Sequence, residues 1–168
     1  NTFTVLNLAT GQKRPLVVFQ NKALFPYITK NNDIYFVDGG FFISDIHSVN
    51  VSTKLDELRE KIEISSSYQD YAPAIGTDTD TVAFTSNRNG VPQIWLKKNG
   101  KHSQLTNYQD FAYITDKQFS PDGKSLLFLR NRVPFILDLN SNLITEPLIE
   151  LKHSSSPIWT CDGKNILV

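Results

Sequence analysis

One block of ten residues recurs along the chain and constrains its fold more than any other feature. The segment Phe119–Phe128 (FSPDGKSLLF) aligns with Trp159–Val168 (WTCDGKNILV) at an offset of 40 residues, and with Ile75–Phe84 (IGTDTDTVAF) at an offset of 44. A weaker copy, which needs one residue of slack, spans Pro26–Phe36 (PYITKNNDIYF). Each copy places a polar Asp, Asn or Gly turn between two apolar runs, and this pattern predicts a β-hairpin.

A second pair of short strands accompanies each of these hairpins at a similar distance. In each pair, the first strand and the polar turn after it occupy one of four segments, namely Val5–Gly11, Ile43–Val49, Ile94–Gly100 and Ile136–Asn142. Four strands in every period of 40 to 48 residues are typical of a β-propeller blade. A β-sandwich would not repeat one motif at this spacing. The sequence therefore predicts an all-β chain, a β-propeller built of four-stranded antiparallel blades.

The repeat also predicts how the chain is divided. We expect a single propeller domain or propeller fragment over residues 1–168, with a half-blade at 1–20, full blades at about 24–66, 70–108 and 113–150, and a complementary half-blade at 157–168. The innermost strands should begin near Pro26, Pro73, Lys117 and Pro157. Because unpaired strand edges invite association, the two half-blades should pair with something. A fragment of a larger propeller or a dimeric ring is favoured over a closed four-bladed ring.

One segment carries two alternative predictions. Between Ser52 and Ile62, the apolar residues Leu55, Leu58 and Ile62 fall on one helical face. The same segment could equally be a loop that leads into a strand at residues 61–64. The chain thus has at most one short helix.

At this point the sequence resembles a known family. The run Phe119–Lys124 (FSPDGK), together with Ser86–Gly90 (SNRNG), Gln93–Trp95 (QIW) and Gln104–Thr106 (QLT), is similar to the TolB-type propeller repeat. The run Ile64–Pro73 (ISSSYQDYAP) further resembles the propeller domains of CadC- or ToxR-like membrane transcriptional regulators. That resemblance implies an extracytoplasmic propeller on the periplasmic side of a bacterial inner membrane, joined in a longer protein to a membrane helix and a DNA-binding winged helix.

Composition excludes several classes of function. Lysine plus arginine and aspartate plus glutamate each number 17, so no net charge attracts the chain to nucleic acid. No apolar run is long enough to cross a bilayer, so any membrane attachment would use a segment absent from this sequence. A single cysteine excludes an internal disulfide framework, and the lack of methionine suggests a processed protein or an excised domain.

The residues that could bind a metal do not form a recognisable site in the sequence. The histidines His47, His102 and His153 occupy different positions of the repeat, so we expect them to face solvent and not to converge on an ion. The acidic pair Asp78 and Asp80 lies at the position of a hairpin turn and lacks the further ligands of an EF-hand loop. We therefore predict no metal and no cofactor.

Other reactive or charged residues have ordinary explanations. Cys161 sits in a turn with no neighbouring histidine or lysine at motif spacing, and no nucleophile elbow occurs, so no catalytic residue is predicted. A basic cluster of Lys97, Lys98, Lys101 and His102 is expected on an outer strand, where charge keeps a sheet edge from pairing with other chains. We predict no direct nucleic-acid binding.

Tyrosine-rich connections lead into two successive blades. They are 40 residues apart, and such connections rim one face of a propeller channel, where ligands and peptides bind. Aromatic rings beside a carboxylate make an adaptable recognition surface, although a repeated packing aromatic explains the pattern equally well. The candidate binding residues on this channel face are Tyr68, Asp70, Tyr71, Tyr108, Asp110 and Tyr113.

These observations favour a non-catalytic interaction or sensor propeller over an enzyme. The main hypothesis is the extracytoplasmic domain of a bacterial membrane-bound transcriptional regulator that recognises a protein or a small ligand on the channel face, with a homodimer as one means of signalling. The alternative is a TolB-like periplasmic protein-interaction module. A lyase or a serine-peptidase propeller is a further alternative with less support, because no catalytic cluster is apparent.

Overall fold

The structure, a computed structural model, describes residues 2–18, 23–39, 43–51, 58–145 and 156–167. Every regular element in these ranges is a β-strand, and no described helix is long and apolar enough to cross a membrane. Sixteen strands are present in the described residues: β1 (Thr2–Leu6), β2 (Lys13–Val18), β3 (Ala23–Ile28), β4 (Asp33–Gly39), β5 (Ser44–Asn50), β6 (Glu60–Ile64), β7 (Asp70–Ile75), β8 (Val82–Ser86), β9 (Gln93–Lys98), β10 (Lys101–Gln104), β11 (Ile114–Phe119), β12 (Ser125–Arg130), β13 (Val133–Asp138), β14 (Ile144–Thr145), β15 (Ile158–Trp159) and β16 (Ile166–Leu167).

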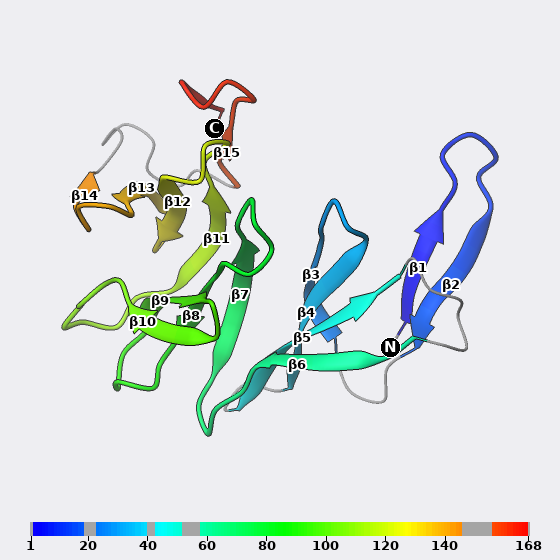
Figure 1. Ribbon diagram of the computed structural model, residues 1–168, viewed down its shortest axis with the longest axis horizontal. Helices are drawn as coiled ribbons and strands as arrows, with labels where there is room; N and C mark the ends of the chain where they lie inside the picture. The colour runs from blue at the N-terminus through cyan, green and yellow to red at the C-terminus, as the bar shows by residue number, and fades with distance from the viewer. Residues whose placement is uncertain (1, 19–22, 40–42, 52–57, 146–155, 168) are drawn as a thin grey trace. The chain divides into compact units, whose positions relative to one another are not determined.

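The described strands form three four-stranded sheets and two two-stranded hairpins (Figure 1). The four-stranded sheets are β3–β4–β5–β6, β7–β8–β9–β10 and β11–β12–β13–β14, and each connects its strands in chain order. The hairpins are β1–β2 and β15–β16. The predicted fold class, four-stranded blades with a half-blade at each end, is therefore confirmed.

The chain divides into two compact units, Asn1–Asp70 and Tyr71–Val168. In the first unit, β1–β2 and the sheet β3–β6 share a small core around Phe36, whose ring meets that of Phe3 edge-on at 5.8 Å. In the second unit, apolar side chains of β7, β8, β9, β11, β12 and β13 pack into one larger core. The single domain over residues 1–168 remains a prediction.

The repeated turn has the same chemistry in successive hairpins. Gly123 and Gly163 have φ values of 70° and 68°, which residues other than glycine rarely adopt. The Ser120 amide donates to the Ser125 carbonyl at 2.8 Å, and the Thr160 amide donates to Asn165 at 2.9 Å. The turns that sequence comparison predicts are therefore present, and the turn residues account for them locally.

The innermost strands share a second feature, a left-handed residue next to the position that begins each predicted inner strand. Phe25, Ala72, Asp116 and Ser156 have φ values of 52°, 49°, 48° and 53°. The pairing register shifts at this point in β3 and in β11, which identifies a β-bulge. The residues that follow are Pro26, Pro73, Lys117 and Pro157, so the repeat preserves a backbone shape as well as a turn.

The segment with two alternative predictions ends in a strand. Residues 60–64 form β6, which pairs with β5 and places Glu60 opposite Val49. This confirms the strand at residues 61–64, one of the two alternatives. The possible helical residues 52–57, including Leu55, lie outside the described residues.

Candidate functional site

The clearest candidate site is the connection from β10 to β11, residues 108–113, which we call the aromatic segment. The start of this segment is held by Gln93, a residue that is only 2% exposed. The Gln93 amide nitrogen donates to the Tyr108 carbonyl at 2.8 Å, and the Tyr108 amide donates to Gln93 Oε1 at 2.9 Å. The Thr106 hydroxyl also donates to Gln93 Oε1, at 2.8 Å. A buried side chain thus replaces strand pairing and fixes where the segment begins.

The end of the aromatic segment is held by the β12–β13 turn. The Tyr113 amide donates to Asn131 Oδ1 at 3.0 Å, and the Asn131 amide donates to the Tyr113 carbonyl at 2.9 Å. Between the two ends, Ala112 is 2% exposed and anchors the segment in the interior. The segment therefore has a defined conformation although it carries no strand.

An ion pair lies beside the first ring of the aromatic segment. Arg130 Nη2 donates to Asp110 Oδ1 at 2.6 Å, and its guanidinium carbon lies 4.3 Å from the centre of the Tyr108 ring. This hydrogen bond holds the pKa of Asp110 below its usual value. Burial raises the pKa of Tyr108, against the opposing effect of Arg130. Arg130 thus links a stacked ring to an exposed carboxylate.

Two rings of the aromatic segment are presented to solvent. Phe111 and Tyr113 are 61% and 66% exposed, and their rings meet edge-on at 5.3 Å. A scattered surface aromatic is ordinary, but a pair of rings in contact on an anchored segment is a feature typical of recognition surfaces. This pair is exposed and can contact a ligand.

Tyr71 occupies a different environment in the second unit. Its side chain is half-buried, and the Ile114 backbone forms a hydrogen bond that favours the ionised hydroxyl. Burial nevertheless dominates and raises the pKa of Tyr71 to about 12. Tyr71 therefore stays neutral at physiological pH and packs beside the start of β11.

The two remaining predicted residues, Tyr68 and Asp70, lie in the first unit. Tyr68 is 49% exposed, but Asp70 is fully buried. Asp70 Oδ2 accepts a hydrogen bond from the Ser66 hydroxyl at 2.7 Å, and the Asp70 carbonyl accepts one from the Ser44 hydroxyl at 2.9 Å. Asp70 was expected to bind a ligand through its carboxylate. These hydrogen bonds instead hold Asp70 in the interior, where it contributes to local packing.

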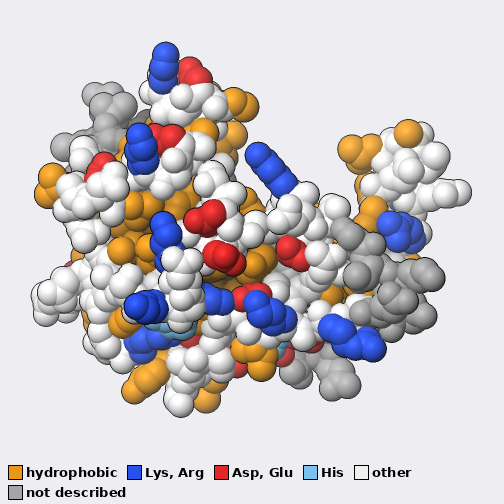
Figure 2. Space-filling view, viewed as in Figure 1, with side chains coloured by type: hydrophobic (Ala, Val, Ile, Leu, Met, Phe, Trp, Pro, Cys, Tyr) orange, Lys and Arg blue, Asp and Glu red, His pale blue; other side chains and the backbone are white. Residues whose placement is uncertain are grey.

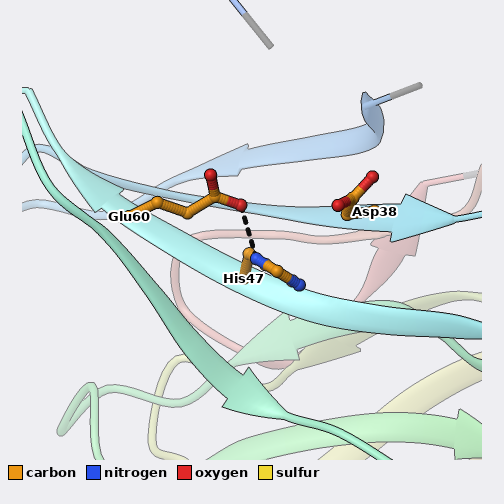
Figure 3. A group of neighbouring side chains, drawn as sticks. All are labelled: Asp38, His47 and Glu60. Carbon is orange, nitrogen blue, oxygen red and sulfur yellow. Dashed lines mark ion pairs between the residues drawn. The ribbon is translucent and has the colours of Figure 1, made fainter. Parts of the chain in front are cut away.

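A second group of polar side chains gathers on the sheet β3–β6 (Figure 3). Asp38 from β4, His47 from β5 and Glu60 from β6 each have a ligand-type atom within 4.8 Å of the others. His47 Nδ1 lies 2.5 Å from Glu60 Oε1, the contact that the dashed line marks in Figure 3. The His47 ring also packs on Phe36, with centres 5.7 Å apart. A nitrogen and two carboxylates in such proximity can hold a cation.

The expectation that the histidines face solvent is wrong for His47. This residue is only 8% exposed, because its strand lies inside a four-stranded sheet and its ring covers an apolar neighbour. His102 is exposed on the outermost strand β10, as expected, and His153 lies outside the described residues. Comparison of the repeats looks for residues at equivalent positions of different blades. It could not reveal Asp38, His47 and Glu60, which lie on three strands of the same sheet.

The other sequence candidates lie where they were expected. Asp78 caps its own hairpin, with Oδ1 accepting from the Thr81 amide at 3.0 Å. Cys161 is an exposed thiol. The basic cluster of Lys97, Lys98, Lys101 and His102 lies on the β9–β10 hairpin. On the face shown in Figure 2, Lys and Arg side chains lie among acidic and apolar ones.

Two further residues belong to this site: Phe111, which ends the second tyrosine-rich connection but was not among the candidate binding residues, and Arg130, which the sequence did not indicate. Phe111 stands where the first tyrosine-rich connection has Tyr71, so the offset of 40 residues could have identified it. Arg130 ends β12 and is distant in sequence from Asp110, so only strand pairing reveals their contact.

Solved structures with a similar fold are known, whereas no family model and no curated protein matches the sequence. TolB from Acinetobacter baumannii superposes with a TM-score of 0.81 at 19% identity, over 98% of this chain and 42% of TolB. A puromycin-hydrolyzing peptidase from Mycobacterium tuberculosis gives 0.66 at 11% identity, over 84% of this chain and 24% of the peptidase. An oligogalacturonate lyase in complex with manganese gives 0.66 at 13% identity, over 96% of this chain and 51% of the lyase.

The chain spans about half or less of the length of each of these proteins. The TM-scores show a shared architecture. At identities this low, the functional residues of those proteins cannot be transferred to this chain. Together with the repeated four-stranded sheets, the TM-scores show that this chain has the fold of TolB-like β-propeller blades.

Proposed function

We propose that this chain is a non-catalytic protein-interaction module of the TolB-like kind, which acts on the extracytoplasmic side of a bacterial membrane. One observation carries the proposal: an exposed pair of aromatic rings, Phe111 and Tyr113, stands on a segment that the fold anchors at both ends. The location rests on the TolB-type resemblance.

Anchoring matters because a flexible loop would lose conformational entropy on binding. The hydrogen bonds from Gln93 and Asn131 order the backbone of the aromatic segment before any partner arrives. Only the side chains then become immobilised in the complex, and a phenyl or phenol ring has few rotatable bonds. The two exposed rings can therefore contribute contact area at a low entropic cost.

The neighbouring ion pair suits the edge of such a contact. Asp110 is largely exposed, whereas the Arg130 side chain is mostly covered. Buried aromatic residues supply most of the energy at protein interfaces, and charged groups at the rim favour one orientation of the partner. The chemistry favours a peptide segment that offers an apolar side chain to the rings and a donor to Asp110.

The more specific hypotheses remain proposals beside this one. A sensor domain of a CadC- or ToxR-like regulator would use the same segment, with a small ligand or a second copy of the chain as the occupant. The similarity to TolB favours the interaction module over that regulator. An enzymatic role is also a proposal, because propellers of this fold include a protein described as a lyase and one described as a peptidase.

The test is selection of peptides against the immobilised 168-residue chain from a random displayed library, followed by anisotropy measurements on the selected peptides. We expect Phe111→Ala and Tyr113→Ala each to weaken binding by about 10-fold or more, as for central aromatic residues of an interface. Tyr27→Ala is the matched control, since Tyr27 is a 42% exposed aromatic residue of the first unit. Peptides that bind both aromatic variants as tightly as the unchanged chain, or a selection that enriches none, would contradict the proposal.

A further inference from the structure

The pairing register places three potential metal ligands on one face of the sheet β3–β6. Phe36 lies opposite His47, and Asp38 lies two residues beyond Phe36 on the same strand. Glu60 lies opposite Val49, two residues beyond His47. Cross-strand partners share a face, and so do residues two apart on one strand. Asp38, His47 and Glu60 therefore form a diagonal across the three neighbouring strands β4, β5 and β6 (Figure 3).

The histidine in the middle of this diagonal has a buried nitrogen beside a carboxylate. His47 is more than nine-tenths buried, and its Nδ1 atom has no hydrogen bond of acceptable geometry among the described residues. The Oε1 atom of Glu60 lies 2.5 Å from this nitrogen. A buried imidazole nitrogen needs a polar partner, and a metal ion shared with the neighbouring carboxylates is one that would satisfy it.

Negative charge gathers around this nitrogen. Asp38 lies directly opposite Asp45 in the register, and Glu60 approaches from the other side. Like charges that face each other across a pair of strands destabilise the sheet. A cation among Asp38, His47 and Glu60 would offset this repulsion and satisfy the imidazole nitrogen together.

The distances allow coordination after a small movement. Ligand atoms of a tetrahedral zinc site lie about 2.0–2.2 Å from the ion and therefore roughly 3.4 Å from one another. The three ligand atoms here lie within 4.8 Å of each other, and His47 Nδ1 lies 2.5 Å from Glu60 Oε1. The Glu60 side chain is 45% exposed, so it can rotate to open that separation while the buried ring stays fixed against Phe36.

We propose that Asp38, His47 and Glu60 form a binding site for one divalent transition-metal ion, best represented by Zn²⁺. One imidazole and two carboxylates suit Zn²⁺ better than Ca²⁺ or Mg²⁺, which prefer ligand sets made of oxygen alone. Three protein ligands leave a fourth position for water or for a ligand atom of a partner. The ion would link three strands of one sheet, and the site lies apart from the function proposed for the aromatic segment.

The test is calorimetric titration of the metal-free 168-residue chain with Zn²⁺ alone, together with thermal unfolding at rising Zn²⁺ concentration. We expect one ion per chain and a midpoint of unfolding that rises with Zn²⁺, because the ion binds the folded state. Co²⁺ in place of Zn²⁺ should give the strong visible absorption of a four-coordinate site.

Matched variants distinguish this site from binding elsewhere. Glu60→Gln and Asp38→Asn keep the shape of each side chain and should weaken Zn²⁺ binding at least about 10-fold, and His47→Ala should abolish it. The controls are Glu63→Gln, which lies on the opposite face of β6, and His102→Ala on an exposed strand; both should bind as the unchanged chain does.

Three results would overturn the proposal. The first is no saturable Zn²⁺ binding by the unchanged chain. The second is binding that Glu60→Gln and Asp38→Asn leave intact, and the third is binding that His102→Ala removes. Because the two carboxylate variants retain the buried ring, failure of His47→Ala to fold would not prevent the decision.

Discussion

The innermost strands β7 and β11 share a left-handed residue and differ in the side chain that follows it. Each contains a left-handed residue, Ala72 at 49° and Asp116 at 48°, and each ends in a buried apolar residue, Ile75 or Phe119. The residue after the left-handed position is Pro73 in β7 but Lys117 in β11. Lys117 is buried, and its ammonium group donates a hydrogen bond to the Thr85 hydroxyl.

This difference shows what the repeat constrains. The left-handed residue recurs in the innermost strand of each blade, and proline is tolerated after it because an edge strand need not donate every amide. The side chain at the position is then free to vary, and in β11 it introduces a buried charge. Burial lowers the pKa of Lys117 to about 7, from 10.5 in the absence of the fold.

The largest expected effect tests the part that both strands share. Replacing Phe119 with alanine should lower the free energy of unfolding by about 3–5 kcal/mol, because a buried aromatic residue leaves a cavity in the core. Ile75→Ala, at the equivalent position of β7, should cost about 2–5 kcal/mol for the same reason. Denaturant unfolding measures both values. A change near zero for Phe119→Ala would show that the repeat register is wrong.

A second prediction makes the two strands alike. Lys117→Pro gives β11 the residue that three other repeats carry, so the chain should remain within about 1.5 kcal/mol of its original stability. The control is Thr115→Pro, which places proline at a residue paired with Leu129 and should cost about 3 kcal/mol or more. Equal losses from the two substitutions would mean that the bulge in β11 differs from the others.

A third prediction uses pH to isolate the buried ammonium group. Between about pH 7 and pH 10.5 the unfolded chain binds the Lys117 proton and the folded chain does not, so the free energy of unfolding should rise with pH in this range. The slope from this group is at most about 1.4 kcal/mol per pH unit. It vanishes below about pH 7, where both states bind the proton, and above about pH 10.5, where neither does.

Lys117→Met should remove this slope, and unfolding curves collected from pH 6 to pH 10 would measure it. Lys124→Met is the control, because the Lys124 side chain is 69% exposed and lies on a hairpin turn. An unchanged slope in Lys117→Met would contradict the lowered pKa of Lys117.

The smallest expected effect concerns the edge of the aromatic segment. Arg130→Gln removes the group that lowers the pKa of Asp110, so that pKa should rise toward its ordinary value in an NMR titration. The stability that the ion pair provides is present above the ordinary carboxyl pKa and is lost as pH falls through the lowered one. Asp122 is the control, since the Ser120 hydroxyl is the main cause of its lowered pKa. A pKa of Asp110 that does not respond to Arg130→Gln would exclude the ion pair as its cause.

Much of the fold was predictable because its signals are local. The Asp-Gly turns at residues 122–123 and 162–163 require particular backbone angles, and those residue types supply them wherever they occur. The candidate site was less predictable. Tyr108, Asp110 and Tyr113 fall on one anchored segment, but Asp70 is buried by contacts with Ser44 and Ser66 that no spacing rule indicates.

The strands, the turns and their repetition follow from local sequence, because alternation and turn chemistry act over a few residues. Which polar residues meet depends on how the strands pair in three dimensions. Pairing of β4, β5 and β6 brings Asp38 and Glu60 to His47, and pairing of β11 with β12 brings the end of β12 near the aromatic segment, so that Arg130 reaches Asp110. A shift of one residue in any of these registers would send the side chain to the opposite face, and register depends on packing of the whole sheet.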